Sequence, residues 1–226
     1  MNKLLYIISL NVILLFINSC ISQKPEMSVS VGINHGGMVE NTDLSVVPNV
    51  QATPESEIDA YSGATHLGVN AGINANIPLK KNELETGFIY MYNYQEFSYA
   101  DQGNMYIGVR KFHVNQIMFP LTYNFLLFKR LLPNSETQLK FGYLGQINLI
   151  NANGTGILPE YTINRWANGA TMGLSAYPFQ FGNGSKLGFD LSVYRGSQIY
   201  TDYYNQKEFE MQGSSFVKLG LRYKFN

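Results

Sequence analysis

Five charged residues fall on the same side of regularly alternating segments, in a chain where charge is scarce. They are Glu85, Lys140, Asp190, Arg222 and Lys224. Only 14% of the 226 residues are charged, against about 25% in an ordinary soluble domain. A buried charge is costly unless it is paired, so we expect these side chains to form a salt-bridge network, with Asp190 beside Arg222. A proton or ion path through them is the less favoured alternative.

Residues that could carry other chemistry lack the necessary spacing. His35, His66 and His113 lie on different segments, without the clustering that a metal site needs. A hydrolase needs a Ser or Thr beside a base, and no Gly-x-Ser-x-Gly motif occurs. The sequence therefore predicts no catalytic residue, no metal and no cofactor.

Composition excludes several classes of protein. The 16 Lys and Arg residues balance 16 Asp and Glu, which argues against a strongly basic nucleic-acid binder. A single Cys excludes a disulfide scaffold, and 45% hydrophobic residues exclude a disordered chain. Low charge with 16 Tyr, 14 Phe and 21 Gly favours a β-rich chain in a partly apolar solvent.

The N-terminal 22 residues have the pattern of a secretory signal peptide. A short positive start is followed by a nearly continuous apolar run from Leu4 to Ile17, which is too short for a spanning helix. Cleavage after Ser22 would leave residues 23–226 as the mature domain. In the alternative, Cys20 is the acylated first residue of a lipoprotein.

Apolar and polar residues alternate with a period of two in eight segments, which predicts eight β-strands. These segments are residues 27–34, 66–77, 87–95, 116–125, 139–149, 169–176, 187–194 and 217–225. Short links are expected at 78–83, 129–137 and 180–185, and long loops at 41–60, 98–110, 151–165 and 197–212. Short links at one end and long loops at the other are typical of outer-membrane β-barrels. Pro120 predicts a bulge or a local break within its strand.

The composition of the two faces indicates which one meets lipid. The polar face is rich in Gly and Asn and poor in charge, which suits a narrow packed lumen better than a soluble surface. The sequence thus predicts an all-β, eight-stranded antiparallel up-and-down transmembrane barrel. Its apolar side chains point outward, both termini are periplasmic, and no pore is open. A soluble lipocalin-like barrel, with its apolar face inside, is the alternative.

Three motifs resemble the outer-membrane β-barrel (PorT-like) proteins of Bacteroidota. They are Glu85-Thr86-Gly87-Phe88, Met118-Phe119-Pro120-Leu121 and the closing Gly220-Leu221-Arg222-Tyr223-Lys224-Phe225. The resemblance covers nearly the whole mature chain and implies an integral outer-membrane barrel without a shared activity. It also implies that Phe225 is the signal read by the barrel assembly machinery, although Asn226 follows it here.

The leading functional hypothesis is an integral outer-membrane barrel with a structural or interaction role and no catalysis. A narrow channel or a secretion-associated transport accessory is the first alternative, and an envelope-lipid-modifying enzyme is the weakest. The expected partners are outer-membrane lipid and the barrel assembly machinery, but not nucleic acid. The acidic loop 41–60 is the best candidate for contact with a protein of the cell envelope.

Overall fold

The computed structural model describes residues 24–37, 60–100, 106–128, 135–156, 158, 161–202 and 214–226. None of these residues belongs to a helix long and apolar enough to cross a membrane. The strands are β1 (Glu26–Gly37), β2 (Ala60–Thr65), β3 (Gly68–Leu79), β4 (Asn82–Ala100), β5 (Tyr106–Phe128), β6 (Glu136–Gly156), β7 (Tyr161–Ile163), β8 (Trp166–Gln180), β9 (Lys186–Gly196), β10 (Tyr200–Asp202) and β11 (Ser215–Lys224).

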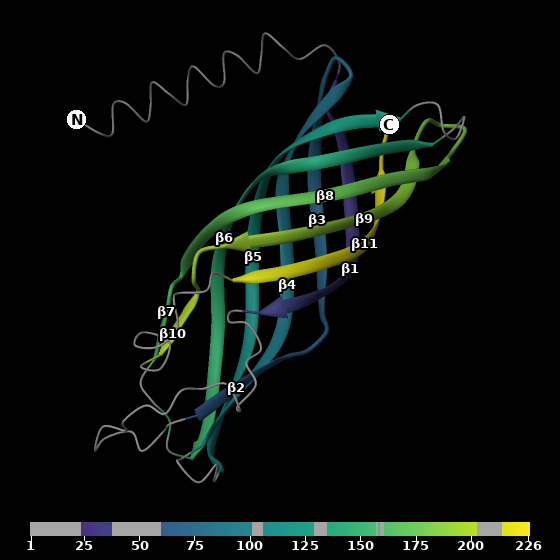
Figure 1. Ribbon diagram of the computed structural model, residues 1–226. Coiled ribbons are helices and arrows are strands. Elements are labelled where there is room, and N and C mark those ends of the chain that lie inside the picture. The colour runs from purple at the N-terminus through teal and green to yellow at the C-terminus, as the bar shows by residue number, and fades with distance from the viewer. Residues whose placement is uncertain are drawn as a thin grey trace, which may run out of the picture.

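The strands close into an antiparallel barrel (Figure 1). The sheet runs in the order β2-β4-β3-β1-β11-β9-β8-β6-β5, and β4 also pairs with β5, which completes the ring. β2 and β3 pair with successive parts of β4, so together they fill one position in the wall. This arrangement confirms the predicted eight-stranded antiparallel barrel. β7 and β10 form a separate two-stranded ribbon.

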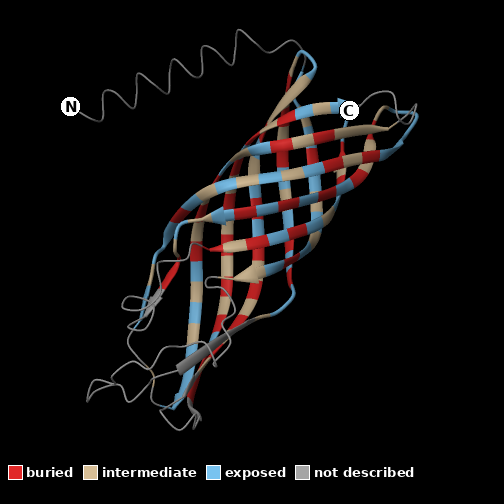
Figure 2. Ribbon diagram, viewed as in Figure 1, coloured by how far each residue is buried: buried red, intermediate tan, exposed pale blue. Residues whose placement is uncertain are grey.

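Large apolar side chains cover the outside of the barrel, while polar side chains fill the inside. Figure 2 shows the resulting alternation of buried and exposed residues along each strand. On β11, for example, Leu219 and Leu221 are exposed, whereas Lys218 and Arg222 are buried. This polarity contradicts the lipocalin-like alternative, which requires the apolar face inside. The exposed apolar residues of the wall include Val31, Ile33, Ile73, Phe88, Leu121, Phe125, Phe141, Met172, Leu174, Phe189, Leu191, Val217, Leu219 and Leu221.

Three neighbouring strands extend far beyond the rest of the wall. β4, β5 and β6 contain 19, 23 and 21 residues, whereas β1, β9 and β11 contain 12, 11 and 10. The predicted loops 98–110, 151–165 and 197–212 are wrong in part, because each contains strand residues: 98–100 and 106–110, 151–156 and 161–163, and 200–202. Most of loop 41–60 and the whole leader, including Cys20, lie outside the described residues.

Both ends of the described chain lie at the end of the barrel that carries the tight turns (Figure 1). The β3–β4 turn needs only Lys80 and Lys81, with Lys80 at a positive φ of 59°. The β8–β9 turn closes with the Gly184 amide donating to the Phe181 carbonyl, and Gly184 has a φ of 85°. We call this the turn end and the opposite end the long end.

Pro120 interrupts the pairing of β4 with β5 without shifting its register. Thr86 pairs with Leu121 and Ile89 with Met118, but the two positions between them do not pair. Proline has no amide hydrogen to donate to the ladder, which accounts for the gap. On its other side Pro120 still lies opposite Leu144 of β6. Of the two sequence-based alternatives, the structure shows the local break.

Inward-facing glycines let the backbones of neighbouring strands come close together. A Cβ on Gly142 would lie 2.2 Å from the Leu121 carbonyl oxygen and 2.6 Å from the Thr122 Cα. Gly32 and Gly220 oppose each other on β1 and β11, and each would also meet its partner's backbone. Because these contacts involve backbone atoms, larger residues there would force the strands apart.

We predict that Gly142→Ala destabilises the barrel by about 1–3 kcal/mol, the usual cost of overpacking. Gly145→Ala is the matched control, since it lies on the same strand and its nearest neighbour would be a Tyr143 ring carbon 3.6 Å away. The measurement is the fraction of protein that migrates as a compact band before heating on a detergent gel. Equal folded fractions for the two variants would contradict this account of the glycines.

Candidate functional site

The lumen is filled by layers that follow the same order along β4, β5 and β6. From the turn end, charged and polar side chains are followed by apolar ones, then by amides, then by a second apolar group. On β5 the polar layer contains Asn124 and Thr122, and the first apolar layer contains Met118. The amide layer contains Gln116 and the second apolar layer contains Phe112, and all five side chains are buried. Because inward residues recur every second position, neighbouring strands in register build each layer together.

The first complete layer is a charge network centred on Glu85 of β4. The Arg222 guanidinium donates to both Glu85 carboxylate oxygens, at 2.6 and 2.5 Å. Lys140 Nζ lies 2.9 Å from Glu85 Oε2 and 2.9 Å from Asp190 Oδ1, so it links the two carboxylates. Asp190 also accepts from Ser175 Oγ at 2.5 Å, and Glu85 accepts from Asn124 Nδ2 at 3.1 Å.

The structure brings four of the five predicted lumen residues together, but with different partners. The expected Asp190–Arg222 ion pair does not form: Arg222 pairs with Glu85, and Asp190 pairs with Lys140. The register explains the difference, since Asp190 lies opposite Gly220 and Arg222 lies opposite Gly188. Asp190 and Arg222 are therefore offset by two residues along neighbouring strands.

Lys224, the fifth predicted residue, belongs to a separate layer at the turn end. Its Nζ is 2.9 Å from Glu26 Oε2 and also pairs with Glu83. Beside it, Lys186 pairs with Glu136. These ion pairs lie across the mouth of the barrel at the turn end.

Several members of these two layers were missed in the sequence. Glu83 was assigned to a turn, although it is two residues from Glu85 and shares its inward phase. Lys218 shares the phase of Arg222 and is buried beside the network. Glu83 could have been found by extending the alternation of its strand back beyond residue 87, whereas Lys218 already lies within the predicted segment 217–225, on the same face as Arg222. Lys218 lines a cavity of only about 20 Å³, room for about one water molecule.

An apolar layer and an amide layer fill the middle of the lumen. Ile89, Met91, Met118 and Leu144 pack with Tyr194 and Phe216 into one buried cluster. Above it, Gln116 Nε2 donates to Asn148 Oδ1 at 2.9 Å, and Gln146 Nε2 donates to the same oxygen at 3.2 Å. The lumen therefore holds packed side chains through its centre.

An aromatic cap closes the long end. Tyr200 of β10 is fully buried against Phe97 and Phe112, with ring centroids 5.3 and 4.9 Å away. Its hydroxyl accepts from Arg110 Nη1 at 2.8 Å, and the Arg110 guanidinium lies 4.3 Å from the centroid of the Tyr161 ring. The side chains of Phe97 and Tyr200 both point into the barrel.

Around the cap the outside of the barrel changes from apolar to polar. On β5, Leu121 faces outward in the wall, but Asn115, His113 and Lys111 face outward further along. Phe112 and Val114 are buried between them. The extended parts of β4, β5 and β6 thus have the polarity of a soluble sheet, with the apolar face inside.

The three histidines lie near the long end and face outward or lie between β2 and β3. His113 Nδ1 is 2.9 Å from the Tyr92 hydroxyl, His35 Nδ1 is 3.4 Å from Thr65 Oγ1, and the His66 ring is 5.0 Å from the Tyr94 ring. Within the described ranges, no three His, Cys, Asp or Glu side chains gather where they could hold a metal ion.

Phe225 lies just after β11 at the turn end. Its amide donates to the Met27 carbonyl at 2.8 Å, so the last residues continue the pairing with β1. Its ring is exposed and lies 4.9 Å from the Tyr223 ring. The ring is therefore accessible from outside the barrel, and the role of Phe225 as an assembly signal stays a prediction.

No family model matches the chain, and no curated protein matches it. The predicted membership of the PorT-like family therefore stays a prediction. A solved structure of the outer membrane protein OprG from Pseudomonas aeruginosa is similar to this chain, with a TM-score of 0.49 and 9% sequence identity. The match covers 90% of this chain and 97% of that chain.

We predict that Glu85→Gln lowers the free energy of unfolding by about 3–5 kcal/mol, because it leaves buried Arg222 and Lys140 without their shared carboxylate. Glu96→Gln is the matched control. Its partner Lys111 is 3.9 Å away and half exposed, so the loss should be within about 1 kcal/mol. Urea titration of the two variants in lipid vesicles measures the difference. Similar losses would show that the lumen network adds nothing beyond a surface ion pair.

Proposed function

We propose that this protein is an integral outer-membrane β-barrel with a closed lumen and a structural or interaction role. The observation that carries the proposal is the inverted polarity of the wall, with apolar side chains outside and charges inside. In water such a surface would be costly, whereas in a bilayer it matches the hydrocarbon. A sheet closed on itself also satisfies the backbone groups that hydrocarbon cannot.

The packed lumen supports a role without conduction. Ion pairs at the turn end, the Glu85 network, the central apolar cluster and the aromatic cap lie in series along the barrel. The small cavities beside the network and beneath the cap measure about 20 and 10 Å³. A steady water-filled path would require several of these layers to move together.

The long strands support an interaction role. The outer faces of β4, β5 and β6 beyond the apolar wall carry Tyr94, Glu96, Lys111, His113 and Asn151. These side chains belong in water, so this sheet would stand outside the membrane, held by the barrel. It is the described surface best placed to meet a partner in the envelope. At the turn end, Phe225 would be available to the barrel assembly machinery.

The membrane-facing wall leads to one prediction. Leu219→Arg places a charge in the middle of β11 on the exposed apolar face, where arginine costs about 2–4 kcal/mol in a bilayer. Asn153→Arg makes a comparable addition on the outer face of β6, within its polar extension. The fraction of protein that inserts into lipid vesicles is measured by gel mobility before heating. It should fall for Leu219→Arg and stay unchanged for Asn153→Arg. Unchanged insertion of Leu219→Arg would overturn the proposed location.

The closed lumen leads to a second prediction, which also tests the narrow-channel alternative. Wild-type protein incorporated into a planar bilayer should give no steady conductance steps. The same preparation must show the compact folded band, so that the absence of steps reflects a closed barrel and not failed insertion. Regular open steps from folded protein would favour a channel or transport accessory.

A further inference from the structure

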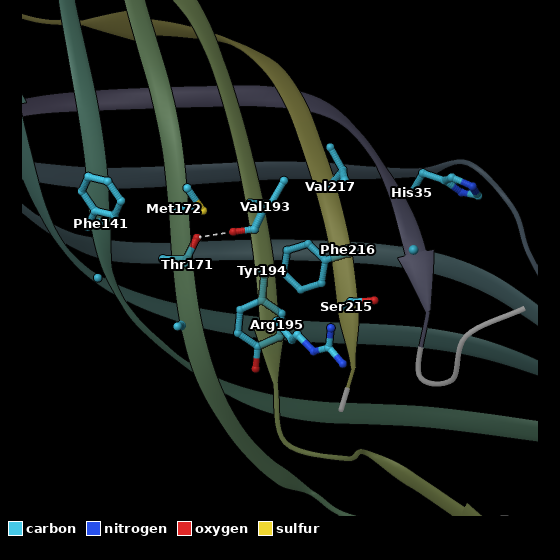
Figure 3. A pocket seen from close by; sticks show the side chains of 13 residues that line it. His35, Phe141, Thr171, Met172, Val193, Tyr194, Arg195, Ser215, Phe216 and Val217 are labelled. Carbon is cyan, nitrogen blue, oxygen red and sulfur yellow. Dashed lines mark hydrogen bonds between the residues drawn. The ribbon is translucent and has the colours of Figure 1, made fainter. Parts of the chain in front are cut away.

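A groove of about 660 Å³ crosses the outside of the wall over β6, β8, β9, β11 and β1. Figure 3 shows it from close by, with Phe141, Met172, Val193 and Val217 in one row across the strands. The register places these four residues side by side, since Phe141 pairs with Met172, Met172 with Val193, and Val193 with Val217. All four are exposed apolar side chains, so one wall of the groove is continuously apolar.

His35 continues the first row beyond Val217, and small residues together with the buried Tyr194 and Phe216 line the rest of the groove. The next row of outward-facing residues contains Ala170, Arg195 and Ser215. Arg195 pairs with Ala170 on one side and with Ser215 on the other. Gly142 and Thr171 lie between the two rows. The Thr171 hydroxyl donates to the Val193 carbonyl at 3.0 Å, so both polar groups already have a partner. Because the Thr171 hydroxyl is already bonded, the floor of the groove presents a mainly apolar surface to a ligand.

One edge of the groove carries a positive charge. Arg195 lies near the last residue of β9, is exposed, and makes no ion pair with any carboxylate in the described part of the chain. The row that contains Arg195 lies nearer the long end of the barrel. The apolar row from Phe141 to Val217 lies nearer the turn end. A ligand that fits must combine a flexible apolar part with an anionic group at the long end. The volume is within the range of about 300–1,000 Å³ typical of small-molecule sites.

We propose that this groove binds one anionic, phosphate-bearing lipid of the surrounding membrane. One acyl chain lies between the two rows, and the phosphate accepts hydrogen bonds from the Arg195 guanidinium, which can bind phosphate with two parallel donors. The inference rests on the membrane location proposed above and adds a specific site to it. Charge complementarity at one edge of the groove and an apolar row along the other edge select this occupant over an uncharged lipid.

The test uses the full-length protein, folded and then transferred to detergent micelles with equal amounts of phosphatidylglycerol and phosphatidylcholine. Native mass spectrometry counts the lipids that remain bound. Wild-type protein should retain one phosphatidylglycerol in preference to phosphatidylcholine. Arg195→Gln should reduce that retention about tenfold, the loss expected for one charge-assisted hydrogen bond.

Two further variants separate the groove from general electrostatics. Ala170→Phe fills the groove without changing charge and should remove the bound lipid. Lys111→Gln removes one exposed positive charge from β5, away from the groove, and should leave retention unchanged. Equal retention of the two lipids by wild-type protein, or retention insensitive to Ala170→Phe, would overturn the site.

The compact folded band and insertion into vesicles are measured for every variant alongside lipid retention. Protein that inserts but shows no preference for phosphatidylglycerol contradicts only the lipid site. Wild-type protein that fails to insert contradicts the proposed membrane location itself, so the two failures are distinguishable.

Discussion

The closed ring of backbone hydrogen bonds is the constraint from which the rest of this structure follows. An apolar outer face demands a solvent without hydrogen-bonding partners, and such a solvent penalises every open strand edge. The pairing of β1 with β11 over ten residue pairs joins the two ends of the described chain. Closing only eight strands leaves a narrow interior, and the inward glycines on β1, β6 and β11 are one consequence of that narrowness.

The narrow interior also determines how charge can be held there. Glu85 and Arg222 are separated by 137 positions in the sequence, yet they meet with two short hydrogen bonds across the lumen. Lys140 and Asp190 are also buried, and each of these four charges lies within 2.9 Å of an opposite charge. The energetic value of this network lies mainly in the cost of disrupting it.

Alternation in the sequence was sufficient to predict the fold and the polarity of each face. The inward positions of Glu85, Lys140, Asp190 and Arg222 follow directly from period-two patterning. Their pairing does not, because it depends on the stagger between strands, which a single strand's pattern does not contain. Sequence analysis therefore identified the members of the network but assigned Arg222 the wrong partner.

The long end was harder to predict for a different reason. Beyond the apolar wall, the inward-facing residues Phe97 and Phe112 are apolar and the outward-facing residues are polar. The alternation of apolar and polar residues therefore reverses its direction where the strands leave the apolar region. Because the sequence analysis assumed one polarity along each strand, it assigned residues 98–110 and 151–165 to loops. The cap further depends on Tyr200 of β10, whose ring centroid lies 4.9 Å from that of Phe112 although β10 pairs with β7 in a separate ribbon.

The interruption at Pro120 makes the β4–β5 pairing the place where the strands of the barrel should separate first. Because Pro120 has no amide hydrogen, the pairing of β5 with β4 is interrupted at this position. On the outer side of the interruption, the rings of Phe88 and Phe119 make an edge-to-face contact with centroids 5.4 Å apart. Heat or lateral pressure from the bilayer should therefore begin to unzip the wall between β4 and β5. The amides on either side should exchange their hydrogens with solvent sooner than those of the fully laddered neighbours.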